Sequence, residues 1–177
     1  MKKLSMEELH RVSAEEFHKQ DKTPLIVILD NVRSMNNVGS IFRTCDGFAV
    51  EKLYLCGITA CPPNKEIAKT ALGATESVDW EYAEDTATLV QRLKAEGVDV
   101  YALEQTDSSI MLDQFQPTAG KKTAIIAGNE LFGVNDSVLP YCNGAIEIPQ
   151  KGTKHSFNVS IATGIVIWHI FNILQKY

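Results

Sequence analysis

Short apolar runs rich in valine and isoleucine alternate along the chain with segments whose apolar residues recur at helical spacing. Runs of this length, bounded by turn residues, are typical of buried strands. They predict strands at residues 25–29, 52–56, 98–103, 123–127 and 145–148. The helical spacing predicts helices at residues 40–48, 85–95, 135–141 and 157–175.

Alternation of strand and helix indicates an α/β fold, a parallel sheet with helices on both faces. Before the first predicted strand, Ser5 with Glu8 and Ser13 with Glu16 have the spacing of helix capping boxes. They predict two short helices. We therefore expect a helical N-terminal extension at residues 1–23 and one domain at residues 24–177.

The composition is that of an ordinary soluble globular protein, with 45% hydrophobic and 22% charged residues. The start of the chain does not have the charge and apolar pattern of a secretion signal. The apolar stretch 159–174 is shorter than a bilayer span and contains His169 and Asn172. These features predict a cytoplasmic protein without a membrane partner.

The chain contains 4 cysteines and 4 histidines, but their spacing matches no zinc site, and we expect no metal. Buried or incidental thiols are the expected role of the cysteines. The net charge of −5 disfavours a nucleic-acid partner. Lys121, Lys122, Lys151 and Lys154 flank glycine-rich segments, so a local basic rim and scattered solvated lysines are both open.

In open α/β sheets, ligands bind beyond the carboxyl ends of the strands, so the segments that follow strands are the places to search. The segment after residues 25–29 is rich in asparagine and contains Asn37, Gly39 and Arg43. Gly39 allows another part of the chain to approach closely. Arg43 is predicted one turn into a helix, pointing back to the loop, or else paired with Asp46 on the helix surface.

The segment after residues 123–127 places Glu130 between Gly128 and Gly133. Glu130 has either a functional role or the simpler one of capping the helix at 135–141 or binding a backbone amide. The glycine spacing matches neither a dinucleotide fingerprint nor a P-loop.

The segment at residues 148–160 contains His155, Ser156 and Asn158. Ser156 is either a site residue or the N-cap of the last helix. Asn158 is a poor helix former in a predicted first turn, which indicates another task for its amide. His155 is either a proton acceptor or a solvated histidine.

Together these segments resemble, in order, the three motifs of the SpoU (TrmH) family of RNA 2'-O-ribose methyltransferases in the SPOUT superfamily. The first motif is matched by 37–43, the second by Gly128, Asn129, Glu130 and Gly133, and the third by 148–152 and 156–160. The resemblance covers residues 24–175. The chain departs from the family pattern at Gln150, where methionine is usual, and at Phe157, where leucine is usual.

The resemblance implies a SPOUT fold whose C-terminal segment forms a trefoil knot, a homodimer, S-adenosylmethionine as cofactor, and tRNA or rRNA as substrate. It assigns the reaction to Arg43, Asn37, Glu130, Ser156 and Asn158. It assigns the cofactor pocket to Leu103, Gly128, Ile148, Gly152, Phe157 and Asn158. The last helix, apolar around most of its circumference, fits burial on more than one side.

Two rival functions are a non-catalytic knotted module that binds RNA and a SPOUT enzyme that methylates a base. The motif 37–43 argues against the second. In this family, the arginine of the first motif is often described as the base that deprotonates the 2'-hydroxyl. A guanidinium has a pKa above about 12 and no lone pair, so we expect Arg43 to bind phosphate and stabilise alkoxide charge instead.

Overall fold

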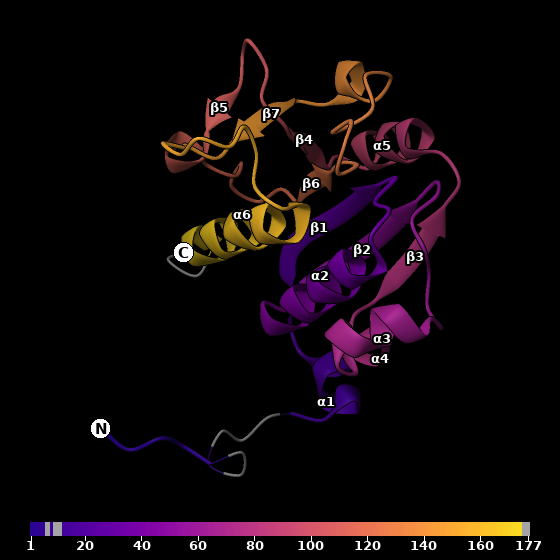
Figure 1. Ribbon diagram of the computed structural model, residues 1–177, viewed down its shortest axis with the longest axis vertical. Helices are drawn as coiled ribbons and strands as arrows, with labels where there is room; N and C mark the ends of the chain where they lie inside the picture. Colours follow the sequence, from indigo (N-terminus) through magenta and orange to yellow (C-terminus); the bar gives the residue numbers. More distant parts are fainter. Residues whose placement is uncertain (6–7, 9–11, 175–177) are drawn as a thin grey trace.

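A seven-stranded parallel sheet forms the centre of the computed structural model, which describes residues 1–5, 8 and 12–174 (Figure 1). The strands are β1 (Thr23–Asp30), β2 (Val50–Cys56), β3 (Trp80–Ala83), β4 (Asp99–Leu103), β5 (Ile110–Met111), β6 (Thr123–Ala127) and β7 (Gly144–Glu147). Their order is β3-β2-β1-β6-β4-β7-β5, and every pairing is parallel. The prediction of a parallel α/β sheet is confirmed.

Helices cover both faces of this sheet. They are α1 (Ala14–Lys19), α2 (Met35–Gly47), α3 (Lys65–Ala71), α4 (Ala74–Ser77), α5 (Thr86–Ala95) and α6 (Val159–Leu174), with 3₁₀ turns η1 (Leu112–Gln114) and η2 (Leu139–Tyr141). Side chains of β1 alternate between two cores, because successive residues of a strand point to opposite faces. Val27 and Leu29 pack with α2 and α6, whereas Ile26 and Ile28 pack with α5.

The predicted helix at residues 135–141 is wrong, because only the 3₁₀ turn η2 forms there. Pro140 has no N–H for a helical hydrogen bond. The Asn135 amide donates instead to the Asp30 carboxylate at 2.8 Å, and the Asn135 side chain accepts from the Ser137 amide at 2.9 Å. Tertiary hydrogen bonds therefore replace helical ones in this segment.

Two other predicted helices have different starts. The helix predicted from residue 40 begins at Met35, with Ser34 as its N-cap. The last helix begins at Val159 instead of residue 157, and Gln175 lies outside the described residues. Within the part of the chain that is described, we find no helix that is both long and apolar enough to cross a bilayer.

Short elements were not predicted, namely α3, α4 and the edge strands β3 and β5. In the N-terminal segment, Ser13 and Glu16 form the expected capping box of α1. The Ser5 amide donates to Glu8 at 2.7 Å and the Glu8 amide to Ser5 at 3.2 Å, the reciprocal bonds of a capping box. Residues 9–11, where the helix was predicted to continue, lie outside the described residues.

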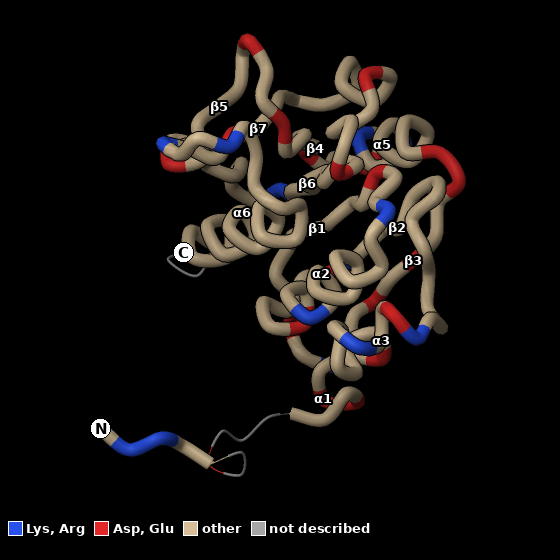
Figure 2. The backbone as a smooth tube through the Cα atoms, viewed as in Figure 1, with Lys and Arg blue, Asp and Glu red and all other residues tan. Residues whose placement is uncertain are grey.

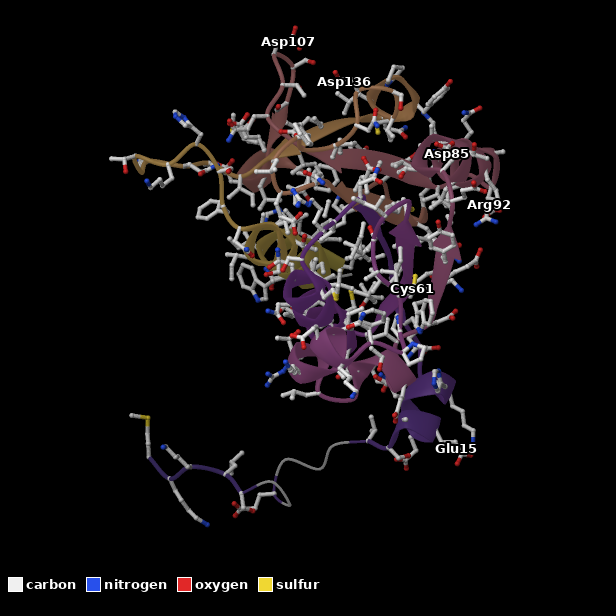
Figure 3. All side chains as sticks on the ribbon, turned by 45° about the vertical axis from the view of Figure 1, so that its right-hand side comes forward. Glu15, Cys61, Asp85, Arg92, Asp107 and Asp136 are labelled. Atoms are coloured by element: carbon white, nitrogen blue, oxygen red, sulfur yellow. The ribbon has the colours of Figure 1, made fainter. Side chains whose placement is uncertain are left out.

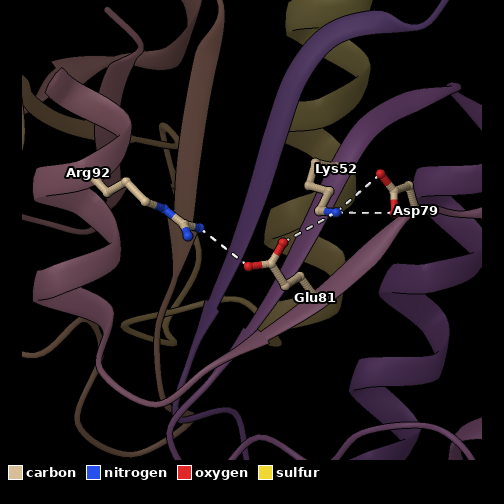
Figure 4. Close-up of polar contacts among 4 residues, drawn as sticks. All are labelled: Lys52, Asp79, Glu81 and Arg92. Atoms are coloured by element: carbon tan, nitrogen blue, oxygen red, sulfur yellow. Dashed lines mark hydrogen bonds and ion pairs between the residues drawn. The ribbon is translucent and has the colours of Figure 1, made fainter. Parts of the chain in front are cut away.

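An ion-pair network ties the edge strand β3 to its neighbours (Figure 4). Lys52 on β2 lies 3.1 Å from Asp79 and 3.5 Å from Glu81, and Arg92 on α5 lies 3.4 Å from Glu81. Exposed ion pairs of this kind contribute about 0–1 kcal/mol each. The network therefore orients the edge strand more than it stabilises the sheet.

Close packing of α2 against α3 depends on Gly39. A Cβ atom at this position would lie 2.1 Å from Thr70 Oγ1 and 2.2 Å from the Ile67 carbonyl oxygen. The close approach predicted for Gly39 is thereby confirmed, and its partner is α3. A carbonyl of helix backbone cannot move aside without shifting the helix.

Gly39→Ala should therefore lower the free energy of unfolding by about 1–3 kcal/mol, the usual cost of overpacking. Gly47→Ala in the same helix is the matched control, because a Cβ there meets nothing within 4 Å. It should not lower stability, and it should raise it by less than about 1 kcal/mol, because Gly47 is the last residue of the helix. Urea unfolding of both variants measures this, and equal effects would contradict the packing argument.

Candidate active site at the carboxyl edge of the sheet

A cavity of about 710 Å³ lies where the loops after β4, β6 and β7 meet the start of α6. Its lining comes from residues 103–106, 127–134, 136, 139, 146–148, 150, 155–159 and 162. In Figure 3, the labelled Asp107 and Asp136 mark this end of the molecule. The volume is that of a small-molecule site, and the position is where parallel sheets bind ligands.

Glu130 connects this cavity to the start of α2. Its carboxylate accepts hydrogen bonds from the Arg33 amide at 2.9 Å, the Ser34 amide at 3.0 Å and Asn37 Nδ2 at 2.9 Å. Burial raises the pKa of Glu130, but these hydrogen bonds together outweigh burial and leave the pKa below its ordinary value. Glu130 is therefore an ionised clamp and is poorly suited to accept a proton.

This geometry tests the two simple roles predicted for Glu130, which were capping a helix at 135–141 and binding a backbone amide. The prediction that its carboxylate binds a backbone amide is confirmed, and the amides belong to the residues just before α2. Its expected role in capping a helix at 135–141 is wrong, because that helix does not form. A negative charge at the start of a helix is also favoured by the helix dipole.

Asn158 joins the third segment to the same clamp. Its Nδ2 donates to Asn37 Oδ1 at 3.2 Å, and Asn37 in turn donates to Glu130. Its Oδ1 accepts from the Ser160 amide at 3.0 Å and the Ile161 amide at 3.4 Å, so Asn158 is the N-cap of α6. The amide has the second task predicted for it, although Asn158 lies before the helix. The N-cap role considered for Ser156 is wrong.

Two glycines permit the loop that carries Glu130. A Cβ at Gly128 would lie 2.1 Å from the backbone carbon of Gly133, and a Cβ at Gly133 would lie 2.0 Å from Glu104 Oε2. Gly133 also has a φ of +71°, which favours glycine. Asn129 anchors the loop by donating to the Asn31 carbonyl at 2.8 Å. The loop is therefore a fixed support for its carboxylate.

Sequence reasoning missed the segment after β4. Glu104 accepts from the Val134 amide at 3.0 Å and the Gln105 amide at 2.9 Å. Gln105 Nε2 donates to the His155 carbonyl at 2.9 Å and so ties this loop to the third segment. A carboxylate directly after a predicted strand was the signal that could have identified it.

Most predicted cofactor residues line the cavity: Leu103, Gly128, Ile148, Phe157 and Asn158. Ser156 and His155 line it as well. Gly152 is exposed and lies outside the lining, with nothing within 4 Å of an added Cβ. The structure therefore brings together all of the predicted cofactor residues except Gly152.

Arg43 lies apart from this cavity. Because α2 begins at Met35, Arg43 is eight residues into the helix, more than two turns, and not one turn as predicted. It is exposed and lines a second cavity of about 550 Å³. No ion pair with Asp46 occurs within the described residues, and Asp46 accepts a hydrogen bond from Ser77 Oγ at 2.5 Å.

The cysteines are buried or partly buried free thiols, as expected. Cys45 and Cys56 are buried. Burial raises the pKa of Cys56 to about 12 and that of Cys142 to about 11, and it raises the pKa of Cys45 as well. Such thiols are not nucleophiles at neutral pH.

A parallel sheet whose carboxyl-edge loops enclose a cavity defines an α/β protein built to bind a small ligand at that edge. Three motif-bearing segments meet there through the contacts of Glu130, Asn37 and Asn158. Residues 24–168 match the model of the SpoU rRNA Methylase family, and the chain belongs to that family. The resemblance seen in the motifs is confirmed.

Named relatives agree with this assignment. The tRNA (guanosine(18)-2'-O)-methyltransferase of Aquifex aeolicus is 33% identical over 172 residues, which cover 95% of this chain and 78% of the relative. The crystal structure of the A. aeolicus TrmH/SpoU tRNA modifying enzyme superposes with a TM-score of 0.81 at 26% identity, covering 92% of this chain and 83% of that one. The AdoMet-bound rRNA methyltransferase of Sinorhizobium meliloti has a TM-score of 0.77 at 28% identity, covering 84% and 56%.

The lowered pKa of Glu130 predicts a pH-dependent contribution to stability. A depressed pKa in the folded state stabilises the protein above the unfolded value of 4.5, and the effect is lost as pH falls through the folded pKa. Glu130→Gln should therefore lower Tm at pH 7, and the difference should shrink below pH 4.5. Glu15→Gln, at an exposed ion pair on α1, is the control. A difference that stays constant to acid pH would refute the clamp.

Proposed function

We propose that this chain is a methyltransferase that uses S-adenosylmethionine to methylate a ribose 2'-hydroxyl of tRNA or rRNA in the cytoplasm. The observation that carries the proposal is the hydrogen-bonded chain Glu130–Asn37–Asn158, which joins the loop after β6, the first turn of α2 and the segment before α6 at the edge of one cavity. The relative named as a tRNA 2'-O-methyltransferase and the AdoMet-bound rRNA methyltransferase support the substrate and the cofactor.

The cavity fits S-adenosylmethionine in size and chemistry. Leu103, Ile146, Phe157 and Ala162 supply apolar surface for an adenine ring. The loop at 128–134 and the end of β7 contribute polar backbone groups that can hold adenine and ribose. When bound, the cofactor supplies a methyl group activated by its sulfonium. Ile148 lines the cavity in the same way, whereas Gly152 lies outside the lining and has no part in the proposed pocket.

The residues of the chain then have to align the attacking oxygen. Well-oriented reacting groups gain about 7–11 kcal/mol from alignment alone. Asn37, Glu130 and Asn158 hold one another in fixed positions at the cavity rim, and Ser156 lines it beside them. We assign these four residues to positioning the ribose and the cofactor. Glu130 is committed to three donors, so it is not the proton acceptor.

Arg43 has an electrostatic role in this mechanism. A guanidinium offers donors in a planar fork and no lone pair, so Arg43 binds a phosphate of the RNA backbone from its place outside the 710 Å³ cavity. The proton leaves the 2'-hydroxyl for an RNA phosphate or for water. S-adenosylmethionine held by the residues that line the cavity would supply the methyl group and would leave as its demethylated product.

We also propose that the C-terminal segment is threaded as the trefoil knot of the family. After β7 near one edge of the sheet, the chain returns to its centre, where α6 packs with β1 and α2 (Figure 1). On the way it contacts the first turn of α2 through Asn158 and the loop after β4 through His155. The family match to residues 24–168 supports the division into an extension at 1–23 and a domain at 24–177.

A homodimer is the proposed assembly. Ile161 and Trp168 on α6 are each 55% exposed, and they lie seven residues apart on one side of the helix. The opposite side of α6 is buried through Val166, Ile167 and Ile170. An apolar helix face of this kind fits a twofold contact with a second copy.

Methyl transfer to RNA from cells that lack this protein tests the function. Wild-type protein should produce 2'-O-methylated nucleosides, detected by mass spectrometry after nuclease digestion. Arg43→Lys and Arg43→Ala should each lower single-turnover rates by at least about 100-fold, since lysine cannot replace a forked donor. Calorimetry should show unchanged cofactor affinity, because Arg43 lies outside the 710 Å³ cavity. Arg92→Ala, on the opposite face of the sheet, should be near normal.

Other products would contradict the proposal. Binding of RNA without methyl transfer would indicate a non-catalytic module, and a methylated base would indicate a base methyltransferase. Near-normal turnover of Arg43→Ala would remove the assigned role of Arg43.

Light scattering tests the dimer. Wild-type protein at micromolar concentration should have about twice the chain mass of 19.6 kDa. Trp168→Glu should shift the mass toward that of the monomer, because it places a charge in the apolar contact. Ile58→Glu is the control, since Ile58 is 66% exposed but lies in the loop after β2. A monomeric wild type with full activity would refute the dimer.

A further inference from the structure

The second cavity lies on the exposed side of α2, next to α3. It is lined by Ser40, Arg43, Thr44, Gly47, Phe48, Lys69 and Thr70. Figure 2 shows basic segments on both helices. Lys69 was not among the residues that sequence reasoning identified, and the catalytic scheme does not use it.

The hydrogen-bond donors of this cavity select an anion. The hydroxyl protons are already committed: Ser40 and Thr70 donate to the Asn36 carbonyl at 2.9 and 3.0 Å, and Thr44 donates to the Ser40 carbonyl at 3.0 Å. Among the described lining residues, the side-chain donors left for a ligand belong to Arg43 and Lys69. Two cationic side chains suit phosphate oxygens.

Lys69 has one competing partner. Its ammonium lies 2.6 Å from Glu66, one turn earlier on α3, and the two side chains are 63% and 49% exposed. Exposed pairs at this spacing are weak and screened by salt. A phosphate can therefore take the place of Glu66, or share the three donors of the ammonium with it.

The position of the cavity indicates a polymer and not a free phosphate. Asn37, Ser40, Thr44 and Gly47 follow one another at three- or four-residue spacing, so they form one stripe along α2. Asn37 is bonded to Glu130 and Asn158 at the rim of the first cavity. Arg43 lies six residues further along, about 9 Å along the helix axis. The second cavity thus continues from the reaction site.

We propose that this cavity holds the phosphate backbone of the RNA substrate, with Lys69 on α3 and Arg43 on α2 as paired phosphate ligands. The proposal rests on the proposed function and adds Lys69 as an RNA-binding residue. It also explains how a chain of net charge −5 binds RNA, since the cations are concentrated where the backbone passes.

Salt dependence of RNA binding tests it. The probe is bulk RNA from cells that lack this protein, and Kd is measured between 50 and 200 mM salt. Losing one phosphate contact should weaken binding and reduce the slope of log Kd against log salt by about 0.7–1. Lys69→Gln should show this change, with calorimetric cofactor affinity unchanged. Lys94→Gln, an exposed lysine on α5, should match wild type.

Glu66→Gln gives the reciprocal test. It releases Lys69 from its carboxylate, so RNA binding should become tighter and more salt-dependent than in wild type. In the double variant with Lys69→Gln, Glu66→Gln should have no such effect, because the ammonium group that it would release is absent.

Three outcomes overturn the proposal. The first is a Kd and salt slope for Lys69→Gln equal to wild type. The second is a loss of RNA affinity in Lys94→Gln equal to that in Lys69→Gln, which would indicate an effect of the total charge of the protein and not of this cavity. The third is dissociation of a dimer by Lys69→Gln, which would place a second copy in the cavity. If wild type binds this RNA but transfers no methyl group, the proposed function fails independently of Lys69.

Discussion

A parallel sheet ends in loops whose backbone amides have no partners in the sheet, and in this protein carboxylates satisfy them. Glu130 binds the amides of Arg33 and Ser34, and Asp30, which is 1% exposed, binds the amide of Asn135 and the hydroxyl of Thr86. Each of these hydrogen bonds contributes about 0.5–1.5 kcal/mol net, so each carboxylate favours one path of the loop that it binds. The position of Asn37, and through it Asn158, follows from the Glu130 clamp.

This arrangement gives the residues that we assign to the site a structural role as well. Asn158 caps α6 with one end of its amide and reaches Asn37 with the other. Its removal would loosen the last helix and the rim of the cavity together. A polar group that starts a helix and also lines a cavity is held in place by both sets of contacts, and a site gains precision from such support by the scaffold.

Periodicity in the sequence was sufficient for the long elements. The five buried strands and the helices of α5 and α6 follow from apolar patterns, because their side chains pack in regular layers. Apolar periodicity failed to predict segments whose conformation depends on tertiary contacts. Gly39 and Asn37 weaken the helical signal at the start of α2, but packing on α3 and bonding to Glu130 hold them in a helix. Lys69 carried no sequence signal, and its proposed role follows only from the neighbours that the fold brings to it.

The length of α2 then separates two tasks in space. Its first turn belongs to the rim of the cavity that we assign to the cofactor, through Asn37. More than two turns later, Arg43 lies beside Lys69, where the local charge is positive although the whole chain is acidic. A rigid helix holds these two positions at a constant distance, and a loop would not. In the proposed function, binding of the RNA backbone at one end restricts which ribose can reach the other, because the same helix carries both positions.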